Sequence, residues 1–84
     1  MSAKEKVRNY ILENYLFTDD QSALKDGDSF LQQGIIDSTG ILEVIYFLED
    51  EFGITVPEEE MVPENLDSVN NIVLFVNTKL AAAK

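Results

Sequence analysis

Ser38 is the residue of this chain whose position most favours chemistry. It lies in the run GIIDSTG over residues 34–40, and an amphipathic, acid-rich segment begins directly after it. A serine becomes a nucleophile only beside a general base, yet the 84 residues include no histidine and no cysteine, and neither lysine nor tyrosine is close to Ser38 in the sequence. The sequence therefore argues against a self-contained serine hydrolase site. We expect that Ser38 is modified by another protein and that the chain is not an enzyme.

A purely structural interpretation of Ser38 stays open. An Asp-Ser pair before an apolar helical pattern is typical of a helix N-cap, where the side-chain oxygen accepts a hydrogen bond from an exposed N–H group. Three features indicate that Ser38 has a role beyond capping. A long loop precedes it, the conformationally adaptable Gly40 follows two residues later, and acidic residues lie along the next segment. A phosphate ester on Ser38 would also lie at the positive end of the helix dipole. The alternative is a non-enzymatic acidic helical interaction module in which Ser38 is only a helix cap.

Neither a metal site nor a phosphate-binding glycine loop is indicated. When the acid-rich loop is aligned from Asp19 with the twelve-residue calcium-binding pattern, Gln21 and Ala23 occupy ligand positions and Leu24 replaces the required glycine. Without cysteine there is no thiolate site, and the four glycines are scattered singly. Most acidic side chains are expected to form a solvated helix face.

Length and charge restrict the partners. Eighty-four residues are enough for one domain with one small core, and 45% hydrophobic against 26% charged residues indicates a globular chain. Six basic and sixteen acidic residues give a formal charge of −10, which repels nucleic acid and anionic membranes, so a basic protein surface is the expected partner.

No run reaches the ~20 apolar residues of a membrane span, and the first residues lack a signal peptide pattern. We expect a cytoplasmic monomer.

Apolar spacing predicts a first helix followed by a long loop. Val7, Tyr10 and Ile11 repeat at helical intervals, which predicts a helix over residues 3–15. Residues 18–37 are rich in Asp, Ser and Gly and are expected to form a loop, and loops of this length in compact domains are usually functional. The apolar side chains that should fix the loop to the core are Phe30, Leu31, Ile35 and Ile36.

The second helix is expected from residue 38 or 39 to residue 52, because apolar residues recur there at i, i+3 and i+4. Gly53 suits the position that ends this helix, residues 54–56 form a short extended link, and Pro57 suits the first position of a helix. Residues 58–61 are predicted to form one short acidic turn that Pro63 closes. The expected buried stripe of the second helix comprises Ile41, Val44, Ile45, Leu48 and Phe52.

A last helix is predicted to begin near Asp67 or Ser68, either of which can cap it, while residues 81–84 should fray. The fold class that these elements predict is all-α: a small four-helix bundle with three main helices and one short third helix. The expected apolar stripe of the last helix comprises Val69, Ile72, Val73, Val76 and Leu80.

These features resemble the phosphopantetheine-dependent carrier proteins, a family that includes acyl carrier proteins and discrete D-alanyl or aminoacyl carriers. The resemblance covers nearly the whole chain and depends on Asp37-Ser38, on the run LEDEFGITVP over residues 48–57, and on Phe30 as the aromatic anchor of the loop. It implies that residues 1–84 form a single carrier domain with an acyl-carrier-protein-like fold. It also implies that 4′-phosphopantetheine is attached covalently to Ser38, so that the cofactor supplies the thiol that the chain lacks.

The partners follow from the same resemblance. A phosphopantetheinyl transferase would move the arm from coenzyme A to Ser38, and successive enzymes would dock their Arg and Lys residues on the second helix. The implied docking residues are Asp37, Glu43, Glu49 and Asp50, which would steer encounters more than they would tighten binding.

The motif around Ser38 also bears on the cargo, the chemical group that such a carrier would hold. Fatty-acid carriers typically have Leu-Gly-x-Asp-Ser-Leu, whereas this chain has GIIDSTG, which resembles more closely the stand-alone carriers loaded by AMP-forming ligases. The implied function is a discrete carrier that holds an activated acyl or aminoacyl group as a thioester and presents it to an acyltransferase or synthase. The sequence favours an acyl cargo and an aminoacyl cargo about equally.

Overall fold

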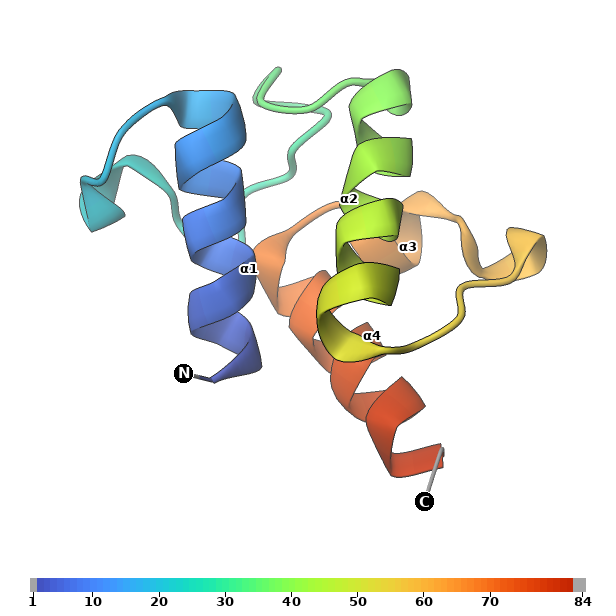
Figure 1. The fold of residues 1–84 in the computed structure, drawn as a ribbon. Helices are drawn as coiled ribbons and strands as arrows, with labels where there is room; N and C mark the ends of the chain where they lie inside the picture. Colours follow the sequence, from blue (N-terminus) through green and yellow to red (C-terminus); the bar gives the residue numbers. More distant parts are fainter. Residues whose placement is uncertain (1, 83–84) are drawn as a thin grey trace.

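All regular structure in residues 2–82, the part of the chain that the computed structural model describes, is helical. α1 and α2 run in opposite directions, and α4 passes beneath them and contacts both α1 and α3 (Figure 1). The predicted all-α bundle with three longer helices and a short third one is confirmed. Within residues 2–82 no helix is both long and apolar enough to cross a membrane. The elements in order are α1 (Ala3–Ile11), a π-helical turn (Leu12–Leu16), a 3₁₀ turn (Gln21–Ala23), α2 (Ser38–Phe52), a 3₁₀ turn (Glu58–Glu60), α3 (Pro63–Leu66) and α4 (Val69–Ala82).

The first helix changes its winding near its end. Ser2 caps α1 by accepting a hydrogen bond from the Glu5 N–H group at 3.1 Å. The helix predicted over residues 3–15 is α-helical only to Ile11 and continues as the π-helical turn. Phe17 then adopts the left-handed conformation, with φ of 55°, which ends the helix.

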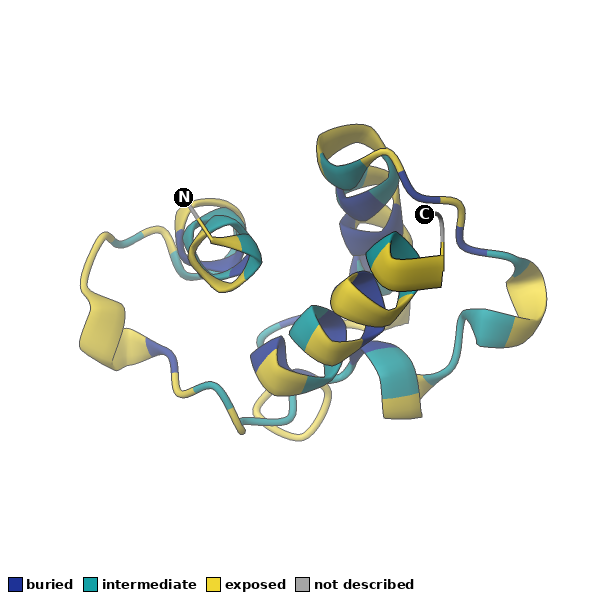
Figure 2. Cartoon of the chain, turned by 90° about the horizontal axis from the view of Figure 1, so that it is seen from below, coloured by how far each residue is buried: buried dark blue, intermediate teal, exposed yellow. Residues whose placement is uncertain are grey.

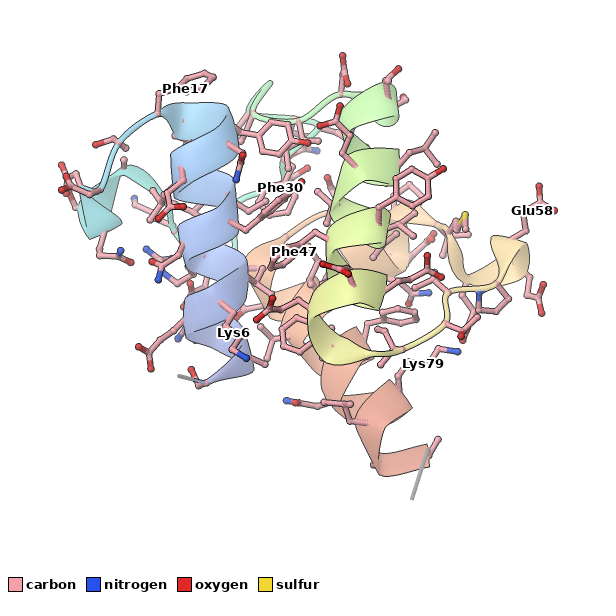
Figure 3. All side chains as sticks on the ribbon, in the orientation of Figure 1. Lys6, Phe17, Phe30, Phe47, Glu58 and Lys79 are labelled. Carbon is pink, nitrogen blue, oxygen red and sulfur yellow. The ribbon has the colours of Figure 1, made fainter. Side chains whose placement is uncertain are left out.

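The long loop is held by a few buried side chains. Phe30 is completely buried between α1 and α2 (Figure 3), and its N–H donates to the Asp67 carbonyl oxygen at 2.8 Å. Burial of such a side chain stabilises the fold by roughly 1.5–3 kcal/mol. Ile36 is buried as well and Ile35 is half-buried, as predicted. Leu31 is 40% exposed, so the prediction that it fixes the loop to the core is wrong.

Asp26 connects the loop to two helices. Its carboxylate accepts from the Lys4 ammonium and the Arg8 guanidinium of α1, both at 2.6 Å. Its carbonyl oxygen accepts from the Asn70 N–H of α4 at 3.0 Å. The hydrogen bond from Lys4, together with that from Arg8, holds the pKa of Asp26 below its ordinary value. The loop is thereby fixed where it passes the ends of both helices.

The connection between α2 and α4 differs from the predicted single turn. Gly53, with φ of 67°, ends α2 as predicted. The acidic segment after Pro57 forms only the 3₁₀ turn Glu58–Glu60, and a separate four-residue helix follows it. Pro63 is the first residue of that helix, so the prediction that it closes the turn is wrong. Proline suits this position because the N–H group that it lacks has no partner in the first turn of a helix.

Ser68 begins α4. Its hydroxyl accepts from the Asn71 N–H at 3.1 Å and its carbonyl from the Ile72 N–H at 3.0 Å, which decides between the two predicted caps. Asp67 instead binds the loop through Ser29 and the Leu31 N–H.

The buried faces of the helices meet in one core (Figure 2). Val44, Ile45 and Leu48 are buried as predicted for the second helix, while Ile41 and Phe52 are half-buried. In α4 the predicted stripe omits Phe75, which is only 8% exposed. Residues 81 and 82 belong to α4, contrary to the expected fraying, and the rest of that predicted tail lies outside the described residues. The buried apolar residues are Val7, Ile11, Leu12, Leu24, Phe30, Ile36, Val44, Ile45, Leu48, Ile54, Val56, Leu66, Val69, Ile72, Phe75 and Val76.

Replacement of Asp26 by Asn should flatten the acid limb of the pH–stability curve. Because the folded-state pKa of Asp26 is depressed, its contribution is complete above the unfolded-state pKa of about 4 and is lost as pH falls through the lower folded-state pKa. The difference in free energy of unfolding between wild type and Asp26→Asn should therefore be largest near neutral pH and shrink below about pH 4. Urea titrations at several pH values measure it, and a difference that grows toward low pH would contradict the assignment.

Candidate functional site

Ser38 is the first residue of α2 and its side chain is exposed. The cap of this helix is Asp37, whose Oδ1 accepts from the Gly40 N–H at 2.7 Å and whose carbonyl accepts from the Ile41 N–H at 3.0 Å. The hypothesis that Ser38 is only a helix cap is therefore wrong, because the neighbouring carboxylate has that role. Within the described residues the N–H groups of Ser38 and Thr39 have no acceptor. Such N–H groups at the positive end of a helix dipole favour the binding of an anion.

Gly40 allows three elements to meet at the first turn of α2. It is buried and has ordinary helical geometry, since the glycines with positive φ are Gly34 and Gly53. A Cβ atom on Gly40 would lie 2.6 Å from Ile36 Cγ2 and 3.3 Å from Tyr15 Cε1. The expectation that Gly40 provides conformational freedom is thus wrong. Glycine is needed here for close packing.

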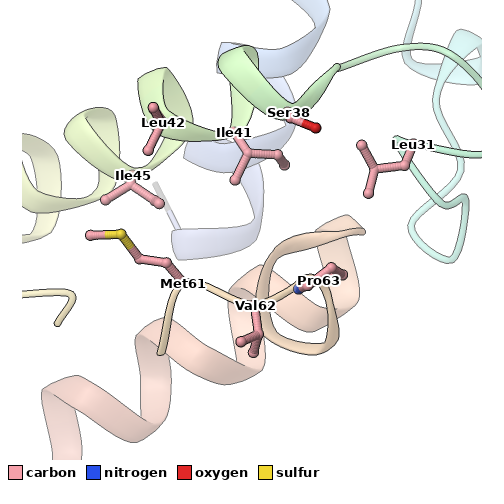
Figure 4. Close-up of a pocket in the computed structure, with 8 residues that line it drawn as sticks. All are labelled: Leu31, Ser38, Ile41, Leu42, Ile45, Met61, Val62 and Pro63. Atoms are coloured by element: carbon pink, nitrogen blue, oxygen red, sulfur yellow. The ribbon is translucent and has the colours of Figure 1, made fainter. Parts of the chain in front are cut away.

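An apolar cleft of about 200 Å³ opens beside Ser38 (Figure 4). One wall is formed by α2 and the other by the connection to α3, and Ser38 lies at one end of the cleft. Sequence reasoning missed this cleft, although two apolar residues within an otherwise acidic segment, Met61 and Val62, were a signal for it. The other lining residues are Leu31, Ile41, Leu42, Ile45 and Pro63.

The four predicted docking acids do not form one cluster. Asp37 caps α2, Glu43 Oε2 accepts from the Tyr15 hydroxyl at 3.1 Å, and Glu49 Oε2 accepts from the Val56 N–H at 3.0 Å. Asp50 is exposed. Three of the four carboxylates therefore also hold the fold together.

The exposed side of α2 combines apolar and acidic groups. Leu42 and Tyr46 are 46% and 66% exposed, and with Ser38 and Asp50 they follow one another at four-residue intervals, which places them along one side of the helix. The sequence contains no basic residue between Lys25 and Lys79. Residues 26–78 therefore contribute no cation to this side of α2.

Most cations of the chain are engaged with its own acids. Lys4 and Arg8 bind Asp26, Lys6 lies 3.2 Å from Glu51, and Lys79 pairs with Glu60. These pairs account for four of the six basic residues. The cations come from α1 and α4, and none of these pairs involves Asp37, Glu43, Glu49 or Asp50. A complementary surface would be basic.

Known proteins similar to this chain are carriers. No family model matches the sequence. It is 41% identical over 73 residues to the D-alanyl carrier protein of Streptococcus suis (strain 98HAH33), a match that covers 87% of this chain and 89% of the relative. The D-alanyl carrier protein of Streptococcus mutans is 38% identical with the same coverage. The acyl carrier protein of Thermosynechococcus vestitus is 36% identical over 78 residues, or 93% of this chain and 91% of the relative.

A small helical bundle that exposes a serine at the start of its second helix is the architecture expected of a carrier. With the similarity over nearly its whole length, the chain belongs to the carrier protein family that includes the D-alanyl and acyl carrier proteins. Carrier proteins are not themselves enzymes, as expected for a chain without a base beside its serine.

The division of roles between Asp37 and Ser38 predicts that the two alanine substitutions affect stability to different extents. Asp37→Ala removes the cap and should lower the free energy of unfolding by about 0.5–2 kcal/mol. Ser38→Ala removes an exposed hydroxyl and should change it by less than about 0.5 kcal/mol. Urea denaturation of the two variants measures both, and a larger loss for Ser38→Ala than for Asp37→Ala would refute the assignment.

Gly40→Ala should destabilise the protein despite the better helix propensity of alanine. Overpacking against Ile36 is expected to cost about 1–3 kcal/mol, which exceeds the gain in propensity of about 1 kcal/mol at most. Gly27→Ala is the matched control, because its Cβ would lie 3.9 Å from the nearest atom. Thermal unfolding of both variants checks the expectation. Equal melting temperatures for the two would mean that the first turn of α2 has room for a methyl group.

Proposed function

We propose that Ser38 is the attachment residue for 4′-phosphopantetheine and that the chain carries an activated acyl or aminoacyl group on this arm. One observation supports the proposal most strongly: the Ser38 hydroxyl is exposed at the start of α2 because Asp37 accepts the capping bond in its place. A serine that the fold does not use is available to a second protein.

The residues around Ser38 suit the cofactor. The N–H groups of Ser38 and Thr39 would face the phosphate at the positive end of the helix dipole, and the apolar cleft begins beside the same serine. In the attachment step Ser38 Oγ would attack the phosphate that bears the pantetheine and form a phosphodiester bond, while the pyrophosphate bond of coenzyme A breaks and adenosine 3′,5′-bisphosphate leaves. Its proton would pass to a base of the transferase, since this chain has no histidine. When bound, the arm supplies a terminal thiol that holds the cargo as a thioester.

The partners in this proposal are a phosphopantetheinyl transferase, an AMP-forming ligase that loads the cargo, and an acyltransferase or synthase with a basic docking patch. Asp37, Glu43, Glu49 and Asp50 are the proposed docking residues. Because the chain has a formal charge of −10, electrostatic steering would speed encounter with each basic partner while still permitting rapid release. That combination suits a carrier which visits several enzymes in turn.

The cargo is proposed only as a class. The relatives named above include D-alanyl and acyl carriers, and both kinds of activated carboxyl group suit a thioester. That residues 1–84 act as a single carrier domain, as a monomer and in the cytoplasm remain predictions from the sequence.

Intact mass spectrometry tests the attachment. When the chain is co-expressed with a broad-specificity phosphopantetheinyl transferase, wild type should gain the mass of one phosphopantetheine group. Ser38→Ala should gain none, because no other residue has this position at the start of α2. Thr39→Ala is the matched control, since it removes the neighbouring exposed hydroxyl and should still be modified. Wild type that gains no mass, or Ser38→Ala that gains it, would sink the proposal.

A further inference from the structure

We propose that Tyr15 is a positioning residue for Ser38: its phenol fixes the first turn of α2 against the end of α1 and so holds the serine in the orientation in which it is modified. This inference rests on the function proposed for Ser38. It adds a residue that is 23 positions away in the sequence and that needs no contact with the transferase.

The Tyr15 hydroxyl contacts α2 at two places. It lies 3.2 Å from the Gly40 carbonyl oxygen and 3.1 Å from Glu43 Oε2. A phenol has one proton, so these two acceptors share a single donor. Burial, followed by the hydrogen bond to the Glu43 carboxylate, raises the pKa of Tyr15 above its ordinary value. The hydroxyl therefore stays protonated and remains a donor throughout the physiological pH range.

Three unusual features of the structure occur together around Tyr15. Tyr15 lies in the π-helical turn, a rare conformation that is often found at functional sites. Phe17, two residues later, has a left-handed conformation that residues other than glycine rarely adopt. The Tyr15 ring also packs where a Cβ on Gly40 would lie only 3.3 Å from its Cε1 atom. The chain departs from regular geometry where α1 meets the start of α2.

Gly40 is consequently held on several sides. Its N–H donates to Asp37, its carbonyl accepts from Tyr15, and the Ile36 side chain lies against its Cα. Ser38 is two residues away and has no side-chain hydrogen bond within the described residues. Its backbone is therefore fixed while its hydroxyl stays available. A reacting group that is oriented in advance reacts faster, and a small displacement of it is costly.

Glu43, which is proposed above as a docking residue, also has a structural role at this place. One of its carboxylate oxygens is the second acceptor of the Tyr15 hydroxyl, so the residue supports the attachment site from within. Tyr10 provides a control for this contact. Its ring stacks on Phe47 at 4.0 Å between centroids, and its hydroxyl donates to the Glu43 carbonyl oxygen at 3.4 Å, not to the first turn of α2.

The test compares Tyr15→Phe with Tyr10→Phe in the full chain. Tyr10→Phe removes a hydroxyl of α1 and Tyr15→Phe removes one of the π-helical turn. Both hydroxyls bond α2, but only Tyr15→Phe loses the bond to its first turn. With purified phosphopantetheinyl transferase and coenzyme A, Tyr15→Phe should lower kcat by about tenfold with KM changed less than twofold, as expected for a displaced reacting group. Tyr10→Phe should be modified at the wild-type rate.

Amide hydrogen exchange gives a second readout that does not depend on modification. In Tyr15→Phe the Gly40 and Ile41 amides should exchange faster, while the amides of Leu48 and Ile72 keep wild-type protection. Unchanged kcat, a rise in KM alone, or faster exchange throughout the helices would each overturn the positioning role. If wild type is not modified at all, the proposed function fails, and the exchange data still decide whether Tyr15 fixes the first turn of α2.

Discussion

The hydrogen bond from the Gly40 N–H to the Asp37 carboxylate determines what Ser38 can do. By satisfying a group that would otherwise lack a partner at the start of α2, Asp37 begins the helix and removes the need for a serine cap. Ser38 is therefore exposed on a fixed backbone beside an apolar cleft. If the serine capped the helix itself, modification would have to break a bond on which the helix depends.

The rest of the fold maintains this start of α2. Phe30 and Ile36 hold the preceding loop in the core, and Asp67 binds the same loop through three hydrogen bonds. Tyr15 then joins the first turn of α2 to the end of α1. The position of Ser38 thus depends on contacts between segments that are distant in the sequence. Part of the negative charge belongs to this framework, since Asp37, Glu43 and Glu49 accept hydrogen bonds within it, whereas Asp50 is exposed.

Features that depend on residue type and on spacing along the sequence were predicted correctly. Gly53 ends α2 because its left-handed conformation suits glycine, the apolar stripe of α2 follows helical periodicity, and Phe30 is the buried anchor of the loop. Features that arise from tertiary packing were not predicted. The sequence around Gly40 does not reveal that Ile36 and Tyr15 crowd it, and nothing local indicates the π-helical turn after Ile11. Pro63 suited either the end of a turn or the start of a helix, and only the surrounding structure distinguishes the two.

Peptide mapping of the chain purified from its native cells tests the central claim most directly. No basic residue lies between Lys25 and Lys79, so cleavage after acidic residues is needed to release the peptide of residues 38–43. We expect this peptide to bear one phosphopantetheine group on Ser38, with or without an acyl or aminoacyl cargo. Recovery of residues 38–43 only in unmodified form, from cells that pantetheinylate their other carriers, would contradict it.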